Sequence, residues 1–122
     1  MNAIDQPVFF IQSEGKGKFV KIKKEQIIYV ESALNYVHIH LQEQSYLTYL
    51  TIYEMQDILP PGSFKRVHKS FIINLDAVVS LQANFIYLSN GARIALGPNY
   101  RKDFFDTINP LMLKSKRQTW LK

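Results

Sequence analysis

A cluster of hydrogen-bond donors follows the turn signal at residues 60–62. The donors are a guanidinium, two ammonium groups, an imidazole and a hydroxyl, all between residues 65 and 70. Such groups bind phosphate oxygens, which carry the negative charge along nucleic acid. An apolar run at 71–73, typical of a buried strand, would hold them at a surface. An internal hydrogen bond that fixes the local turn is an equal alternative for the imidazole. We predict phosphate contacts at Arg66, His68, Lys69 and Ser70.

Base contacts are expected from exposed connections with amide, phenol and guanidinium tips. The predicted turn at 34–36 and the predicted loop at 97–101 both carry such tips. We therefore predict base contacts at Asn35, Tyr36, Asn99 and Arg101.

Catalysis explains the same residues less well. Ser70 and His68 lie two residues apart, so on a strand they share a face without forming a triad, and the sequence has no Gly-x-Ser-x-Gly elbow. His38 and His40 share a predicted strand face, and His68 is the candidate third ligand of a metal-dependent enzyme. Nothing supplies further ligands at a recognisable spacing, which favours a solvated sheet face. We predict no enzyme, no metal and no cofactor.

Composition points to one basic domain. The chain has 122 residues, 15 basic against 10 acidic side chains and a net charge of +5, which attracts polyanions such as nucleic acid. It has no cysteine, so disulfides and thiolate metal sites are excluded. No apolar run approaches the roughly 20 residues that span a bilayer, and residues 1–7 are not basic and are followed by no signal-peptide core. We expect a cytoplasmic protein without a membrane partner.

Hydrophobic patterning predicts a mainly antiparallel β domain. Alternation is clear at 19–23 and 36–41, and Asn90-Gly91 is a strong hairpin signal. Thr51 and Glu54 form a capping-box pattern that opens a short helix before Pro60. A terminal helix is predicted at 100–108, and residues 97–99 are predicted to be a loop. We assign 1–7 to a lead-in, 8–108 to the domain and 109–122 to a basic tail.

Three strings, at 27–32, 35–39 and 64–74, together resemble the LytTR family of bacterial DNA-binding domains. The diagnostic string is Arg-x-His-x-Ser-aromatic-hydrophobic-hydrophobic-Asn, which runs from Arg66 to Asn74. Further agreement lies at 88–91 and 94–104. The resemblance covers residues 8–108 in one register.

The resemblance implies about ten short, mostly antiparallel strands in three small sheets, with one short middle helix or turn and a short C-terminal helix. It also implies the output domain of a two-component response regulator that controls transcription. Such domains insert loops into successive major grooves of double-stranded DNA and tend to bind direct repeats as dimers. Carried onto this sequence, the resemblance adds a base contact at Lys69. A receiver domain normally precedes them and is missing from this chain. Where the family often has a basic pair, this chain has residues 97–99, and Arg101 is the candidate replacement. The alternative is a β-rich protein-interaction or sensory module with a basic face.

Overall fold

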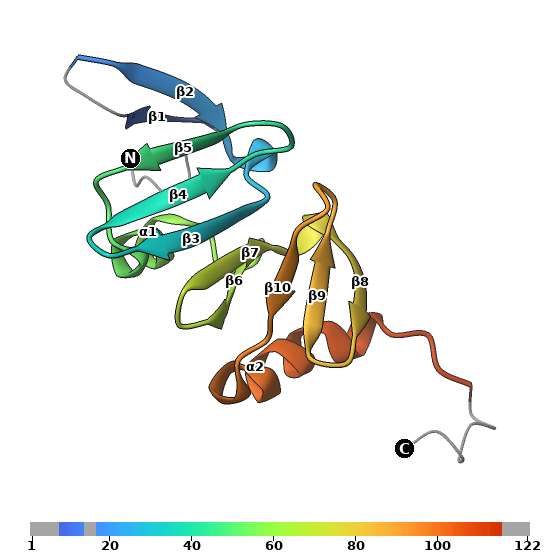
Figure 1. Cartoon of the computed structure of the whole chain (residues 1–122). Coiled ribbons are helices and arrows are strands. Elements are labelled where there is room, and N and C mark those ends of the chain that lie inside the picture. The colour runs from blue at the N-terminus through green and yellow to red at the C-terminus, as the bar shows by residue number, and fades with distance from the viewer. Residues whose placement is uncertain (1–7, 14–16, 116–122) are drawn as a thin grey trace.

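Ten short strands in three antiparallel sheets form the framework of the domain (Figure 1). The computed structural model describes residues 8–13 and 17–115, so the predicted lead-in and residues 116–122 of the predicted tail lie outside the described residues. The β1-β2 ribbon consists of β1 (Val8–Gln12) and β2 (Phe19–Lys23). The middle sheet has the order β5-β4-β3-β7-β6, from β3 (Tyr29–Ala33), β4 (Tyr36–His40), β5 (Ser45–Thr48), β6 (Phe64–His68) and β7 (Phe71–Asn74). The third sheet has the order β10-β9-β8, from β8 (Val78–Gln82), β9 (Phe85–Leu88) and β10 (Arg93–Ala95).

Two helices complete the fold, and the predicted mainly-β class is confirmed. Helix α1 (Ile52–Ile58) connects β5 to β6, and α2 (Pro98–Ile108) follows β10. Thr51 Oγ1 accepts from the Glu54 amide at 3.1 Å, and Glu54 Oε1 accepts from the Thr51 amide at 2.9 Å. The capping box predicted for α1 is therefore present, and it satisfies two amides that the first turn leaves unpaired. Short 3-10 turns lie at Lys24–Gln26, Leu75–Ala77 and Asn109–Leu111.

Strand β7 of the middle sheet is buried on both faces, so this part of the sheet lies between two hydrophobic clusters. Val30, Val37 and Ile72 belong to the cluster beneath the ribbon and α1. Ile73, the next residue along β7, is fully buried in the cluster that α2 and the third sheet share. Successive side chains of a strand point to opposite faces, so one strand supplies both cores. Each such burial stabilises the fold by about 1.5–3 kcal/mol.

The start of α2 corrects one prediction. Residues 97–99 were predicted to be a loop, but Pro98 opens the helix and Gly97 is its N-cap. Proline suits the first helical position because its fixed φ matches the helix and its missing N–H would have no partner there. Asn99 and Arg101 therefore lie on the first turns of α2 rather than in a loop.

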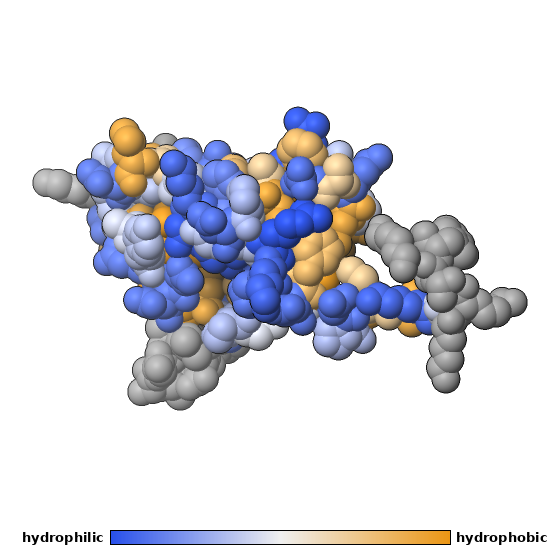
Figure 2. All heavy atoms as spheres, turned by 90° about the horizontal axis from the view of Figure 1, so that it is seen from below, coloured by the Kyte–Doolittle hydropathy of each residue, from blue (hydrophilic) through white to orange (hydrophobic). Residues whose placement is uncertain are grey.

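Apolar surface gathers over the C-terminal half of the face shown in Figure 2. A groove of about 370 Å³ runs between β8 and the end of α2, and Val79, Leu111 and Met112 contribute to its lining. Among the described residues, neither helix is long and apolar enough to cross a membrane.

Candidate nucleic-acid interface

A row of backbone pairings aligns several turns along one edge of the molecule. Ser13 bridges to Thr48 on β5, and Thr48 pairs with Val37 on β4. Val37 pairs in turn with Ser32 on β3, whose amide donates to the carbonyl of Ser70 at 2.9 Å. The row thus runs from the end of β1 past the β3–β4 turn (residues 34–35) to the β6–β7 turn (residues 69–70). In Figure 1 these turns lie along the left edge.

The N-terminus of α2 joins this edge through Gly97. The Gly97 amide donates to the carbonyl of Val67 at 2.8 Å. A Cβ atom on Gly97 would lie 3.2 Å from Tyr100 Cδ2 and 3.5 Å from the Cα of His68. The absence of a side chain therefore lets the helix start approach the end of β6 closely. We name the β3–β4 turn, the β6–β7 turn and the first turn of α2 together the turn edge.

Arg66 fixes the β6–β7 turn from inside the protein. Its Nε donates to the carbonyl of His68 at 2.9 Å, and one terminal nitrogen donates to the carbonyl of Lys69. The other terminal nitrogen donates to Oε1 of Gln56 on α1 at 2.7 Å. Only 9% of Arg66 is exposed. All three guanidinium nitrogens are therefore engaged by the protein itself.

Two tyrosine rings flank the same guanidinium. Its carbon lies 5.0 Å from the ring centre of Tyr53 on α1 and 5.8 Å from that of Tyr100 on α2. Both distances suit a cation–π attraction. Sequence reasoning identified Arg66 but missed its partners Gln56, Tyr53 and Tyr100. No local signal could have found them, because they come from two helices that meet only in the folded chain.

His68 and Ser70 shape the tip of this turn together. The Ser70 amide donates to Nδ1 of His68 at 3.1 Å, and the imidazole lies 5.3 Å from the ring of Phe71. In the neutral ring Nδ1 is then the acceptor, which leaves the hydrogen on Nε2. His68 thus performs the turn-fixing role that was one of its two interpretations. Lys69 between them is exposed.

The β3–β4 turn presents its residues differently. Leu34 has a positive φ of 60° and is 95% exposed, and Asn35 beside it is also exposed. Tyr36 contacts Tyr49, with ring centres 4.5 Å apart. A hydrogen bond with Tyr49 raises the pKa of Tyr36 above its ordinary value.

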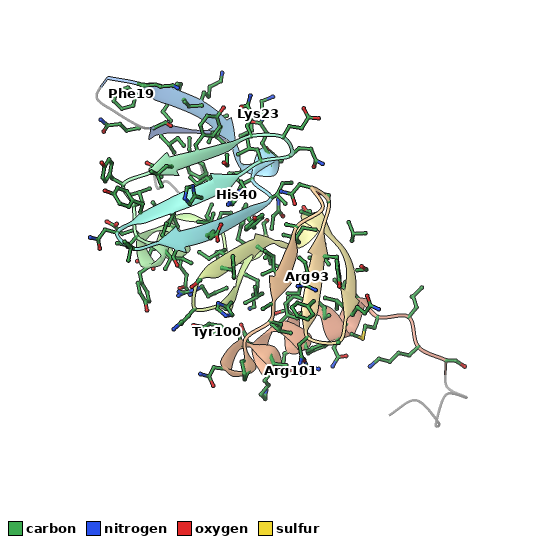
Figure 3. All side chains as sticks on the ribbon, viewed as in Figure 1. Phe19, Lys23, His40, Arg93, Tyr100 and Arg101 are labelled. Atoms are coloured by element: carbon green, nitrogen blue, oxygen red, sulfur yellow. The ribbon has the colours of Figure 1, made fainter. Side chains whose placement is uncertain are left out.

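The two predicted base contacts on α2, Asn99 and Arg101, differ in how many contacts they make within the protein. Asn99 is exposed on the first turn. Arg101 donates to Oδ1 of Asn84 in the β8–β9 turn at 2.9 Å, and its guanidinium lies 4.8 Å from the ring of Phe105. Figure 3 shows Arg101 at the lower side of α2 and Tyr100 at its start. The structure thus places Asn99 on the turn edge and ties Arg101 toward the third sheet.

The histidines on β4 have partners on the sheet face. His40 Nε2 lies 3.0 Å from Oε1 of Glu31, and its ring stacks on Tyr29 with centres 4.2 Å apart. His38 lies 5.9 Å from the His40 ring. Within residues 8–13 and 17–115, the structure brings together no group of three or more side chains that could hold a metal ion.

Comparison with known proteins gives consistent matches. The model of the LytTr DNA-binding domain family matches residues 17–109. The transcriptional regulatory protein LytR of Staphylococcus aureus is 29% identical over 99 residues, which are 77% of this chain and 40% of that protein. The sensory transduction protein LytT of Bacillus anthracis is 28% identical over 89 residues, which are 69% of this chain and 36% of that protein. The chain therefore spans well under half of the length of these relatives.

A solved structure agrees with the fold. A LytTr DNA-binding domain from Bacillus cereus superposes with a TM-score of 0.75 at 18% identity, over 84% of this chain and 97% of that domain. At 18% identity this likeness supports the fold alone. Membership of the family rests on the match of residues 17–109 to the family model. The chain belongs to the LytTr DNA-binding domain family.

Proposed function

We propose that the domain binds double-stranded DNA sequence-specifically through the turn edge and regulates transcription. The observation that carries the proposal is the row of backbone pairings from Ser13 to Ser70, which aligns separate turns on one side. Protein groups that specify a sequence must reach base edges from an element that enters a groove. Several short turns held on one rigid sheet meet that requirement. Such binding needs no catalytic residue.

Phosphate contacts in this proposal come from the β6–β7 turn. Lys69 is exposed, Ser70 offers its hydroxyl, and the Nε2 hydrogen of His68 remains for a phosphate oxygen. Arg66 was predicted as a phosphate contact. Its three internal hydrogen bonds and its burial favour a positioning role instead, because three of its five N–H donors are engaged and only 9% of the residue is exposed.

Base contacts in this proposal come from both ends of the turn edge. Asn35 and Tyr36 serve from the β3–β4 turn, Lys69 from the tip of the β6–β7 turn, and Asn99 from α2. Arg101 joins them by exchanging its bond to Asn84 for a base or phosphate. Each good bidentate contact of this kind discriminates against the wrong base by about 1–3 kcal/mol.

The chain matches only part of each longer relative, and the names of these relatives support a proposal about the protein as a whole. The curated relatives carry names of a transcriptional regulator and a sensory transduction protein. We infer that this domain is the output module of a response regulator with a receiver domain, and that it binds direct repeats as a homodimer. Mass measurement on a bound two-repeat duplex tests the stoichiometry of two domains per site.

Selection of bound sequences from a random duplex pool tests the proposed function. We expect enrichment of one motif, and binding to it whose affinity falls steeply with salt. The Asn35→Ala variant should relax the motif at one or two positions. The matched control, Gln82→Ala on β8, should keep the motif. A pool that shows no enrichment, or equal affinity for the enriched and random duplexes, would contradict sequence-specific binding.

A further inference from the structure

The β1-β2 ribbon has two chemically different faces. Ile11 and Ile22 point inward and are buried in the first hydrophobic cluster. The opposite face is mostly exposed and carries aromatic and cationic side chains. Its exposed members are Phe10 and Gln12 on β1 and Phe19, Lys21 and Lys23 on β2.

The strand register gathers these side chains into one patch. Phe10 pairs with Lys21, and Gln12 pairs with Phe19. Phe10 is 67% exposed and Phe19 is 63% exposed, so both rings lie in water beside ammonium groups. Lys18 precedes β2 at the end of the ribbon, outside the paired residues, and is also exposed, and its carbonyl accepts from the Ser13 amide at 3.1 Å. No ion pair involves Lys18 or Lys21 among the described residues.

The backbone row connects this patch to the turn edge. Ser13, which follows β1, bridges to Thr48, and Thr48 Oγ1 donates to the carbonyl of Gln12 at 2.7 Å. Thr48 pairs with Val37, which follows the β3–β4 turn by two residues. The end of the ribbon that carries Lys18 and Phe19 is thus held on the same side as the turns. Figures 1 and 3 show this end at the upper left, with Phe19 labelled.

We propose that the ribbon is an accessory arm that binds the sugar–phosphate backbone of the duplex beyond the sequence that the turn edge reads. Lys18 and Lys21 contact phosphates, and the ring of Phe19 packs against deoxyribose. An exposed cationic face attracts a polyanion, and its position next to the turn edge selects the same DNA molecule. The arm adds affinity without base preference, because phosphates carry no sequence.

This arm rests on the proposed function and goes beyond the matched family region. The family model begins at residue 17, so β1, which supplies half of the ribbon, lies outside it. The arm also explains why a small basic domain exposes two phenylalanines on a strand pair beside its lysines. A strand pair that served only as a lid on the first core would need apolar side chains on its inner face alone.

Salt dependence of DNA binding tests the arm. The probe is a duplex that carries the selected motif with ten base pairs of flank on each side. We expect the variant Lys18→Gln/Lys21→Gln to lower the slope of log affinity against log salt by about two, because each phosphate contact contributes about 0.9. The matched control, Arg93→Gln/Lys114→Gln, removes the same charge from the C-terminal half and should keep the wild-type slope. Phe19→Ala should weaken binding at every salt concentration without changing the slope.

Shortening the duplex gives an independent measurement. Removal of one flank, on the side that the ribbon faces, should weaken the wild-type protein and leave the double lysine variant unchanged. Equal slopes for the double lysine variant and its control would overturn the arm, as would equal responses to the shortened duplex. If Phe19→Ala binds DNA with unchanged affinity, the Phe19 ring does not contact the DNA. If the wild-type protein selects no motif at all, the proposed function is wrong, and the arm, which rests on it, is wrong with it.

Discussion

The β6–β7 turn and the β3–β4 turn lie on the same edge of one sheet, but they are built in different ways. The first is held by Arg66, whose guanidinium binds two carbonyls of the turn, and by the bond from Ser70 to His68. The second presents Leu34 and Asn35 to solvent, and among the described residues no side-chain hydrogen bond reaches either of them. We infer that the two turns make different kinds of contact with DNA. A fixed turn suits phosphates at regular positions, and an open turn suits adjustment to base edges.

Loss of the guanidinium should have the largest effect. Arg66→Ala removes three hydrogen bonds from a buried charged group and leaves turn carbonyls unpaired, so the free energy of unfolding should fall by about 3 kcal/mol. Urea denaturation measures this loss. The control Arg93→Ala removes an exposed arginine 4.3 Å from the Phe85 ring and should cost less than about 1 kcal/mol.

DNA binding by Arg66 variants separates positioning from contact. If Arg66 only positions the turn, Arg66→Gln, which removes the charge, should weaken binding and leave the salt slope unchanged. A slope lower by about one would instead show a phosphate contact. Arg66→Lys is the matched control, because it keeps the charge and should keep the wild-type slope in either role.

The open turn should show the reverse pattern. Asn35→Ala should change the free energy of unfolding by less than about 0.5 kcal/mol, because the side chain is exposed. The same change should relax base preference by about 1–3 kcal/mol at one or two positions. Competition with single-base variants of the selected duplex measures the preference. A uniform loss across all variants would make Asn35 a backbone contact and weaken the contrast between the turns.

Close packing beside the fixed turn gives a smaller effect. Gly97→Ala places a methyl group 3.2 Å from Tyr100 Cδ2 and 3.5 Å from the His68 ring, and should destabilise the domain by about 1 kcal/mol. The control Gly62→Ala meets no atom within 4 Å and should change stability little. Thermal unfolding of both variants tests the packing, and equal melting temperatures would count against it.

The smallest effect concerns strain in the open turn. Leu34 is 95% exposed with a φ of 60°, so Leu34→Gly loses no packing and should raise the free energy of unfolding by about 0.5 kcal/mol. Asn35→Gly, at a neighbouring position without positive φ, should lower it by a similar amount. Urea midpoints of the two variants should therefore move in opposite directions, and movement in the same direction would show that Leu34 is not strained.

Local patterns were sufficient for most of the fold. Alternation at 19–23 and 36–41, the Thr51 cap and the Asn90-Gly91 turn each depend on neighbouring residues, and each structure appears where it was predicted. The start of α2 was missed because glycine followed by proline suits a loop as well as a helix N-terminus. The residues around Gly97-Pro98 alone do not distinguish a loop from a helix N-terminus.

The candidate site was predicted by residue type but not by arrangement. Asn35 lies in the turn that was predicted at 34–36, and Lys69 and Ser70 form the β6–β7 turn, while their contacts with DNA stay predictions. The internal role of Arg66 depends on Gln56 from α1 and Tyr100 from α2, and the bond from Arg101 to Asn84 spans two elements. Such contacts arise only from tertiary packing, so residue type alone could not assign the roles of these two arginines.

Amide chemical shifts on titration with the selected duplex test the central claim most directly. The claim predicts that the largest changes fall in the β3–β4 turn, the β6–β7 turn and the first turn of α2, with small changes at the β4–β5 turn and on β8. Changes concentrated at the groove between β8 and α2, with the turn edge unaffected, would contradict it.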